Sequence, residues 1–300
     1  MEITKCPACS SSKCQIIDSY TDKIEIIAKE YRFVQQPYNI NKCIDCGLHY
    51  KSDILSPEEF SLYYTNVDFK GWSYERLYPP ERVIKKYLEG KPVGKRILDF
   101  GCSEGRLLAS LVNDYECYGF DLNAEALKVA KSKGISIFED LDKLLNCGMQ
   151  FDFIIMVDVF EHLLTPTQVI DSLQKLLKKG GELVISTGSA NAPAYLKKPA
   201  EFWYFINPQH VCMLSNEFIH YLCSRNNLSV CFKDFSSHYD IPVGQKIKIY
   251  IVFYSYWYTL NMRKISFLHR LYPFNKIFKW KLYPHFPVTK DHVIVALKNN

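Results

Sequence analysis

Two pairs of cysteines lie near the start of the chain, and two residues separate the members of each pair. The first pair is Cys6-Pro-Ala-Cys9 and the second is Cys43-Ile-Asp-Cys46. In such a turn both thiolates point the same way, and two turns of this kind can surround one metal ion tetrahedrally. Because the protein would fill all four positions, we expect a structural Zn²⁺ ion here. An iron–sulfur centre or a redox pair is the alternative.

A second group of residues indicates a nucleoside site. A predicted strand ends in Asp99, and Gly101 and Gly105 follow at once, so the backbone can approach a ligand at the carboxyl edge of a sheet. The next predicted strand ends at Asp121, whose carboxylate can accept hydrogen bonds from two ribose hydroxyls. Ser103 stands where the pyrophosphate of a dinucleotide would require glycine, which favours a cofactor without phosphates. Taken singly, these residues also suit a plain strand-to-helix turn.

Proton-transferring side chains follow the fourth and fifth predicted strands, at the same sheet edge. They are Glu161, His162, Tyr204 and His210. His210 is favoured as the base because its loop can fold over the site, although a histidine that only hydrogen-bonds the loop is nearly as plausible. For Glu161 and His162, packing and cofactor positioning are favoured over catalysis.

The chain after residue 95 alternates short apolar strands with amphipathic helices, as in a doubly wound α/β fold with a mostly parallel, Rossmann-like sheet. The strands are expected at 96–100, 116–120, 135–139, 151–157, 182–187, 228–235 and 292–298. The helices are expected at 104–114, 123–133, 167–178 and from the Ser215 cap to about Arg225. Gly180 and Gly181 are expected to close the third helix.

The chain divides into three predicted parts. Residues 1–52 form a zinc-ribbon module with a strand excursion at Ile24–Ile27, and residues 53–94 form a helical linker or cap. There Tyr63 and Tyr64 either pack a helix on the core or cover the bound ligand. Residues 95–300 form the main domain.

Composition fits a globular chain with an unusual insert. The 300 residues are 48% hydrophobic, and the absence of a leader-like start or a long apolar run predicts a cytoplasmic protein. Residues 241–290 hold nine of the 37 Lys and Arg residues and none of the 32 Asp and Glu residues. Together with its aromatic residues, this charge suits peripheral contact with the inner surface of a membrane, a diphosphate-linked sugar, or RNA.

Four segments resemble, in order, the motifs of the class I S-adenosylmethionine-dependent methyltransferases, whose sheet has seven strands. They are 97–105, 119–122, 151–163 and 177–183. The resemblance implies S-adenosylmethionine as the cofactor and assigns positions around it. Its methionine part would lie near Asp99, Gly101, Cys102 and Gly105, its ribose on Asp121, its adenine beside Leu122 and Asp140, and the floor of the site at Val157 and Asp158.

The cysteine module ahead of such a domain resembles that of deoxysugar C-methyltransferases and of methyltransferases for surface polysaccharides. The stretch from Trp203 to Val211 is similar to a loop of related sugar methyltransferases. The resemblance implies a nucleotide-linked or lipid-linked sugar as the acceptor. Zinc-bearing ribosomal RNA methyltransferases have a similar module, so RNA is the runner-up. A zinc-bearing binding protein that has lost activity is the third hypothesis.

Overall fold

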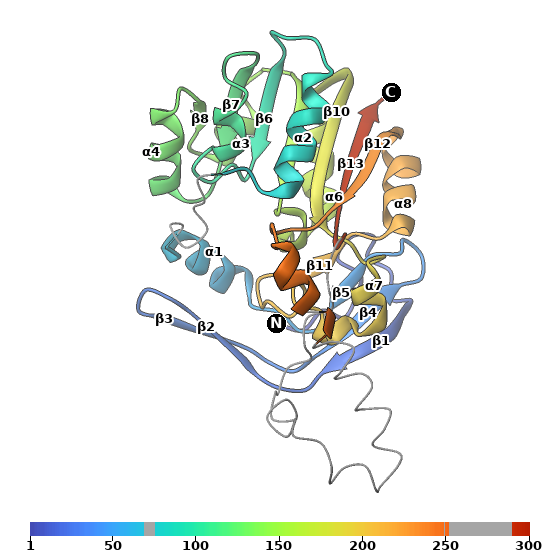
Figure 1. The fold of residues 1–300 in the computed structure, drawn as a ribbon. Helices are drawn as coiled ribbons and strands as arrows, with labels where there is room; N and C mark the ends of the chain where they lie inside the picture. The colour runs from blue at the N-terminus through green and yellow to red at the C-terminus, as the bar shows by residue number, and fades with distance from the viewer. Residues whose placement is uncertain (69–75, 249, 252–289) are drawn as a thin grey trace, which may run out of the picture.

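A computed structural model describes residues 1–68, 76–248, 250–251 and 290–300 of the chain. Its main sheet has seven strands in the order β12-β13-β10-β9-β6-β7-β8 (Figure 1). Their bounds are β6 Arg96–Phe100, β7 Glu116–Phe120, β8 Ser136–Phe138, β9 Phe151–Val157, β10 Leu177–Gly188, β12 Leu228–Ser236 and β13 His292–Asn299. Strands β8, β7, β6, β9 and β10 run parallel, whereas β13 pairs antiparallel with β10 and β12. The predicted Rossmann-like fold is confirmed.

Alternating residues of the central strands pack on opposite faces of this sheet. Ile97 and Phe153 belong to one buried cluster, while Leu98 and Ile154, the next residues along each strand, belong to another. Because both faces are buried, these strands are continuous apolar runs, which is why their positions could be predicted.

Helices cover both faces. Those of the main domain are α2 Pro79–Glu89, α3 Arg106–Ala109, α4 Ala124–Ser132, α5 Leu141–Leu145, α6 Pro166–Lys175, α7 Pro193–Lys197 and α8 Asn216–Asn226, with 3₁₀ turns at Phe160–His162 and Pro199–Glu201. Side-chain caps fix several starts: Asn123 accepts from the first turn of α4, and Ser215 accepts from the Phe218 amide of α8.

Two helix predictions were wrong at their ends. Of the helix expected at 104–114, only α3 is α-helical. After it, the amides of Ser110 and Leu111 bond carbonyl oxygens three residues back, which replaces the α-helical pattern. The helix expected at 167–178 ends as α6 at Lys175, because Leu177 already pairs with Phe151 as the first residue of β10. Gly180 and Gly181 therefore lie in an irregular part of a strand.

The N-terminal residues form strands that join the main domain directly. The strands are β1 Cys14–Tyr20, β2 Ile24–Ala28, β3 Tyr31–Gln35, β4 Tyr38–Cys43 and β5 His49–Lys51. A second sheet has the order β1-β4-β5-β11, and its last strand, β11 Cys212–Met213, comes from the loop after β10. In Figure 1 the blue N-terminal strands lie below the main sheet, together with α1 Pro57–Asn66. The residues of the predicted ribbon thus share a sheet with the region that carries His210.

Most of the basic, aromatic insert predicted at 241–290 lies outside the described residues. Its contact with a membrane, a substrate or RNA stays a prediction. None of the helices in the described ranges is both long and apolar enough to cross a bilayer.

Gly47, directly after the second cysteine pair, offers a test of how the N-terminal strands meet α8. Its φ is +76°, and a Cβ there would lie 2.3 Å from the Cβ of Glu217. Gly94 has a similar φ of +72°, and within the described structure no atom lies within 4 Å of its Cβ position. We expect Gly94→Ala to cost about 1 kcal/mol and Gly47→Ala at least twice that, measured by denaturant unfolding. Equal losses would show that the two segments are not packed together.

Candidate functional site

A cavity of about 650 Å³ opens at the carboxyl edge of the main sheet. It is bounded by the loop after β6, by the ends of β7 and β9, by α1, and by the 203–210 segment. The predicted site residues that line it are Asp99, Gly101, Cys102, Asp121, Leu122, Val157, Asp158, Glu161, His162, Tyr204 and His210. The structure therefore brings most of the predicted residues to one place.

Glycines allow the loop after β6 to pack closely against neighbouring side chains. A Cβ on Gly101 would lie 2.3 Å from Cγ2 of Val159, and a Cβ on Gly105 would lie 2.3 Å from Cδ1 of Ile135. Both glycines also have positive φ, which disfavours other residues. Gly101 lies at the cavity wall, whereas Gly105 packs behind it and is not one of the described lining residues. Its observed contacts fit a loop-packing role.

Asp121 is held at the end of β7 by backbone amides. Its two carboxylate oxygens accept hydrogen bonds from the Ser103 amide and from the Asn123 amide, each at 2.8 Å. Each oxygen retains acceptor capacity toward the cavity. The backbone of Ser103 has a φ of +48°. A residue with a side chain therefore adopts the left-handed conformation that glycine usually takes in such a turn.

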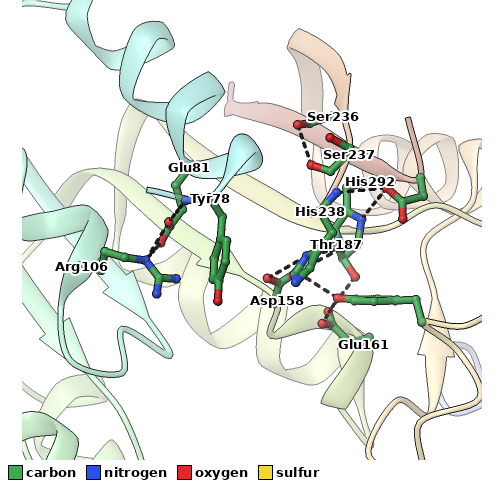
Figure 2. Close-up of polar contacts among 12 residues, drawn as sticks. Tyr78, Glu81, Arg106, Asp158, Glu161, Thr187, Ser236, Ser237, His238 and His292 are labelled. Carbon is green, nitrogen blue, oxygen red and sulfur yellow. Dashed lines mark hydrogen bonds and ion pairs between the residues drawn. The ribbon is translucent and has the colours of Figure 1, made fainter. Parts of the chain in front are cut away.

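Asp99 is buried beneath this loop, and its Oδ1 has no hydrogen-bond partner among the described residues. Burial, together with the charges of Glu81 and Asp121, raises the pKa of Asp99 to about 8. Glu81 is paired with Arg106 at 2.9 Å, and the Arg106 guanidinium lies over the ring of Tyr78 (Figure 2). A cationic ligand beside Asp99 would favour the ionised form of this carboxyl group and so lower its pKa again.

Asp140 lies slightly apart from this arrangement. Its side chain accepts hydrogen bonds from the amides of Asp142 and Lys143 and so caps α5. In the described part of the cavity wall, the neighbouring Leu141 is a lining residue and Asp140 is not. Its proposed contact with an adenine stays a prediction.

Tyr204 also lines the cavity, and it packs against Gly188, the last residue of β10. A Cβ on Gly188 would lie 2.4 Å from the Tyr204 ring, so the glycine makes room for it. The Tyr204 hydroxyl contacts Asp158 at 2.9 Å and also Glu161. Because a phenol has one proton, it can donate to only one of the two carboxyl groups.

The surroundings shift the pKa values of these groups in different directions. Burial raises the pKa of Glu161 above its ordinary value, although its two oxygens accept hydrogen bonds from Thr187 and Tyr204. Burial alone would raise the pKa of Asp158, but His238, His292 and Tyr204 hold it below its ordinary value. Burial and both carboxylates raise the pKa of Tyr204 far above its ordinary value, which makes it a hydrogen-bond donor and excludes it as a base near neutral pH.

His210 is buried between two aromatic side chains. The centre of its ring lies 4.2 Å from that of Tyr204 and 4.7 Å from that of His162. Its Nδ1 has no hydrogen-bond partner in the described part of the chain. Burial, with the charge of His162 adding to it, lowers the pKa of His210 well below its ordinary value, so the surroundings favour the neutral ring.

His162 is fixed by neighbours instead of pointing freely into the cavity. Its Nδ1 lies 2.7 Å from the Tyr64 hydroxyl and 2.9 Å from the Gln209 carbonyl oxygen. Tyr64 lines the cavity, and Tyr63 bonds the Gln209 side chain. These contacts tie α1 to the loop that carries His210 and favour a positioning role for His162.

A family model described as a methyltransferase domain matches residues 72–231, more than half of the chain. The ubiquinone biosynthesis O-methyltransferase of Photobacterium profundum is 30% identical over 158 residues, which cover 47% of this chain and 67% of that relative. The chain belongs to the S-adenosylmethionine-dependent methyltransferases.

Some relatives of this methyltransferase are matched over less of their length. The ubiquinone biosynthesis O-methyltransferase of Erwinia tasmaniensis is 30% identical over 112 residues, which cover 34% of this chain and 46% of that protein. The methyltransferase therefore spans about half of that relative. The complex between the Haloferax volcanii Trm112 methyltransferase activator and a methyltransferase aligns with a TM-score of 0.50 at 14% identity, over 80% of this chain and 97% of that one. This likeness concerns the fold alone.

The residues of the methyltransferase fit its cofactor. The unpartnered Oδ1 of Asp99 and the acidic wall suit a ligand with an ammonium and a sulfonium group, and Asp121 can accept from ribose hydroxyls. Gly101 lies in the cavity wall, so its backbone borders the space that the ligand would fill.

Sequence reasoning missed three residues in the region around Tyr204. His238 follows β12, and Asp291 and His292 lie at the start of β13. Trp203 Nε1 donates to Asp291 at 3.1 Å. The motif around Trp203 predicted one part of the cavity wall. No short sequence pattern indicates His238 or His292, because the antiparallel pairing of β12 with β13 brings them together.

The four cysteines of the methyltransferase meet as predicted. The Sγ atoms of Cys6 and Cys46 lie 3.5 Å apart, as do those of Cys9 and Cys43, and all four lie within 4.8 Å of one another. Tetrahedral zinc with Zn–S bonds of about 2.3 Å separates its sulfurs by about 3.8 Å. The arrangement is therefore compatible with zinc, and the residues leave no position for substrate.

We expect Cys46→Ser to remove one zinc ion per chain and to lower the thermal stability by several degrees, because it breaks the tetrahedral site. Cys14→Ser is the matched control, since Cys14 is exposed and outside the cluster. Elemental analysis and thermal unfolding measure the two effects. Unchanged zinc content in Cys46→Ser would refute the site.

Proposed function

We propose that this methyltransferase methylates an oxygen of a small polyhydroxylated acceptor, most simply a nucleotide-linked or lipid-linked sugar. The observation that carries the proposal is the buried acid–base cluster of Tyr204, Glu161 and His210 in the wall of the cavity. When bound, S-adenosylmethionine supplies an activated methyl group, so the protein has only to orient the acceptor and take its proton. The names of the relatives support oxygen as the accepting atom.

The lining around this cluster supports a sugar. Trp203 and Tyr239 present rings against which the apolar face of a sugar can pack, and their centres lie 5.8 Å apart. Asp158, Asn207 and Gln209 add acceptors and donors for several hydroxyl groups. A phenolic acceptor is the second candidate, because the relatives act in ubiquinone biosynthesis.

Each residue of the cluster has a role in the proposal. His210 accepts the proton of the acceptor hydroxyl through a ring nitrogen, a role supported by its place in the cavity wall and by the lack of a described partner for its Nδ1. Tyr204 orients the acceptor through its hydroxyl, and Glu161 holds Tyr204 in place. His162, fixed by Tyr64, supports the ring of His210.

We expect Asp121→Ala to weaken the binding of S-adenosylhomocysteine on the order of 100-fold, because two charge-assisted hydrogen bonds to the ribose are lost. Asp142→Ala is the control, since Asp142 is an exposed residue outside the cavity wall. Calorimetric titration measures both affinities, and circular dichroism checks the fold. Normal affinity in Asp121→Ala would remove the ribose assignment.

The acceptor is tested by methyl transfer from labelled S-adenosylmethionine to a panel of nucleotide sugars, catechols and RNA. We expect transfer to a nucleotide sugar, and a fall in kcat on the order of 100-fold or more in His210→Ala with unchanged binding of S-adenosylhomocysteine. His220→Ala, on the exposed face of α8, is the control. Transfer only to catechols would favour the phenolic candidate, and full activity of His210→Ala would leave that histidine with a structural role.

A further inference from the structure

Three potential metal ligands meet beside Tyr204 at the ends of three strands. Asp158 follows β9, His238 follows β12 and His292 begins β13. Figure 2 shows the three side chains pointing toward one another. His238 Nδ1 lies 3.1 Å from His292 Nε2, and the two oxygens of Asp158 lie 3.6 Å and 3.4 Å from these nitrogens, respectively.

These separations match those between ligand atoms around one metal ion. With bonds of about 2.1 Å, an octahedral ion holds adjacent ligand atoms about 3.0 Å apart, and a tetrahedral ion holds them about 3.4 Å apart. All three atoms lie within 4.8 Å of one another. One ion can therefore contact all three side chains with small adjustments of their positions.

His292 is also oriented as metal-bound histidines usually are. Its Nδ1 lies 3.3 Å from Oδ1 of Asp291, so the other nitrogen, Nε2, faces Asp158 and His238. Asp291 is itself held by the Trp203 indole and by the His238 amide. The contact between His292 and Asp291 is at an ion-pair distance, and Nδ1 of His292 makes no hydrogen bond of regular geometry among the described residues. A carboxylate next to the nitrogen that does not bind the metal is the usual second neighbour of a metal-bound histidine.

The neighbouring group of Glu161, His162 and His210 is less suitable, although these side chains also lie close together. Nδ1 of His162 is within hydrogen-bond distance of Tyr64 and Gln209, and Glu161 is bonded by Thr187 and Tyr204. Binding a metal there would break several of these contacts.

We propose that Asp158, His238 and His292 bind one divalent first-row transition-metal ion beside Tyr204 in the cavity. Two imidazoles and one carboxylate suit zinc, iron or manganese and leave coordination positions open. Asp158 and His238 line the cavity and His292 lies behind them, so the open positions face the acceptor. The metal site stands without the proposed function, but its role in polarising an acceptor hydroxyl rests on that proposal.

The test counts metal ions in the full chain. After equilibrium dialysis against Zn²⁺, we expect two zinc ions per chain in the wild type, one with the four cysteines and one at this site. His238→Gln should bind one, and the control His220→Gln should bind two, because His220 is exposed on α8. A single zinc in the wild type, or two in His238→Gln, would overturn the proposal.

A second measurement needs no variant. The wild-type chain carrying one zinc is titrated with Co²⁺, and nitrogen and oxygen ligands predict weak visible bands without the intense charge transfer of thiolates. No bound Co²⁺, or thiolate bands alone, would overturn the proposal. Calorimetry with S-adenosylhomocysteine separates the two proposals, since failure to bind it counts against the methyltransferase site and not against the metal site.

Discussion

Parallel pairing of β6 with β7 and β9 is the constraint on which the rest of the site depends. It brings Asp99, Asp121 and Asp158 to one edge of the sheet, where burial makes unpaired negative charge costly. Two of the carboxylates have partners within the protein: backbone amides for Asp121, and histidines and Tyr204 for Asp158. Asp99 has no described partner for its Oδ1, and its pKa is raised accordingly. The electrostatics of the site follow from this crowding.

Local sequence patterns predicted the cofactor half of this arrangement well. The strands at 96–100, 116–120 and 151–157 were placed to the residue, because buried parallel strands are uninterrupted apolar runs with glycines and acids at their ends. Local patterns predicted the ends of elements less well. Gly180 and Gly181 resemble the end of a helix, and only the pairing of Leu177 with Phe151 shows that they belong to a strand.

The part of the cavity around Tyr204 depends on contacts between residues far apart in the chain, which no short sequence pattern contains. His238 and His292 are 54 positions apart in the chain, and they meet because β13 inserts between β10 and β12. Strand β11 has two residues, too few for any periodicity, yet it joins the N-terminal sheet to the loop after β10. The cysteine pairs were readable because their spacing is itself the signal.

Lys51 shows what this join implies. It is fully buried in β5, its ammonium group donates to the carbonyl oxygen of Asn207 at 2.7 Å, and its amide donates to Val211. The segment between these two residues, which carries His210, is therefore anchored on one side by the N-terminal sheet, in addition to its contacts with Glu161 and His162. Substitutions in that sheet can thus move the wall around His210 without touching the strands that carry Asp99 and Asp121.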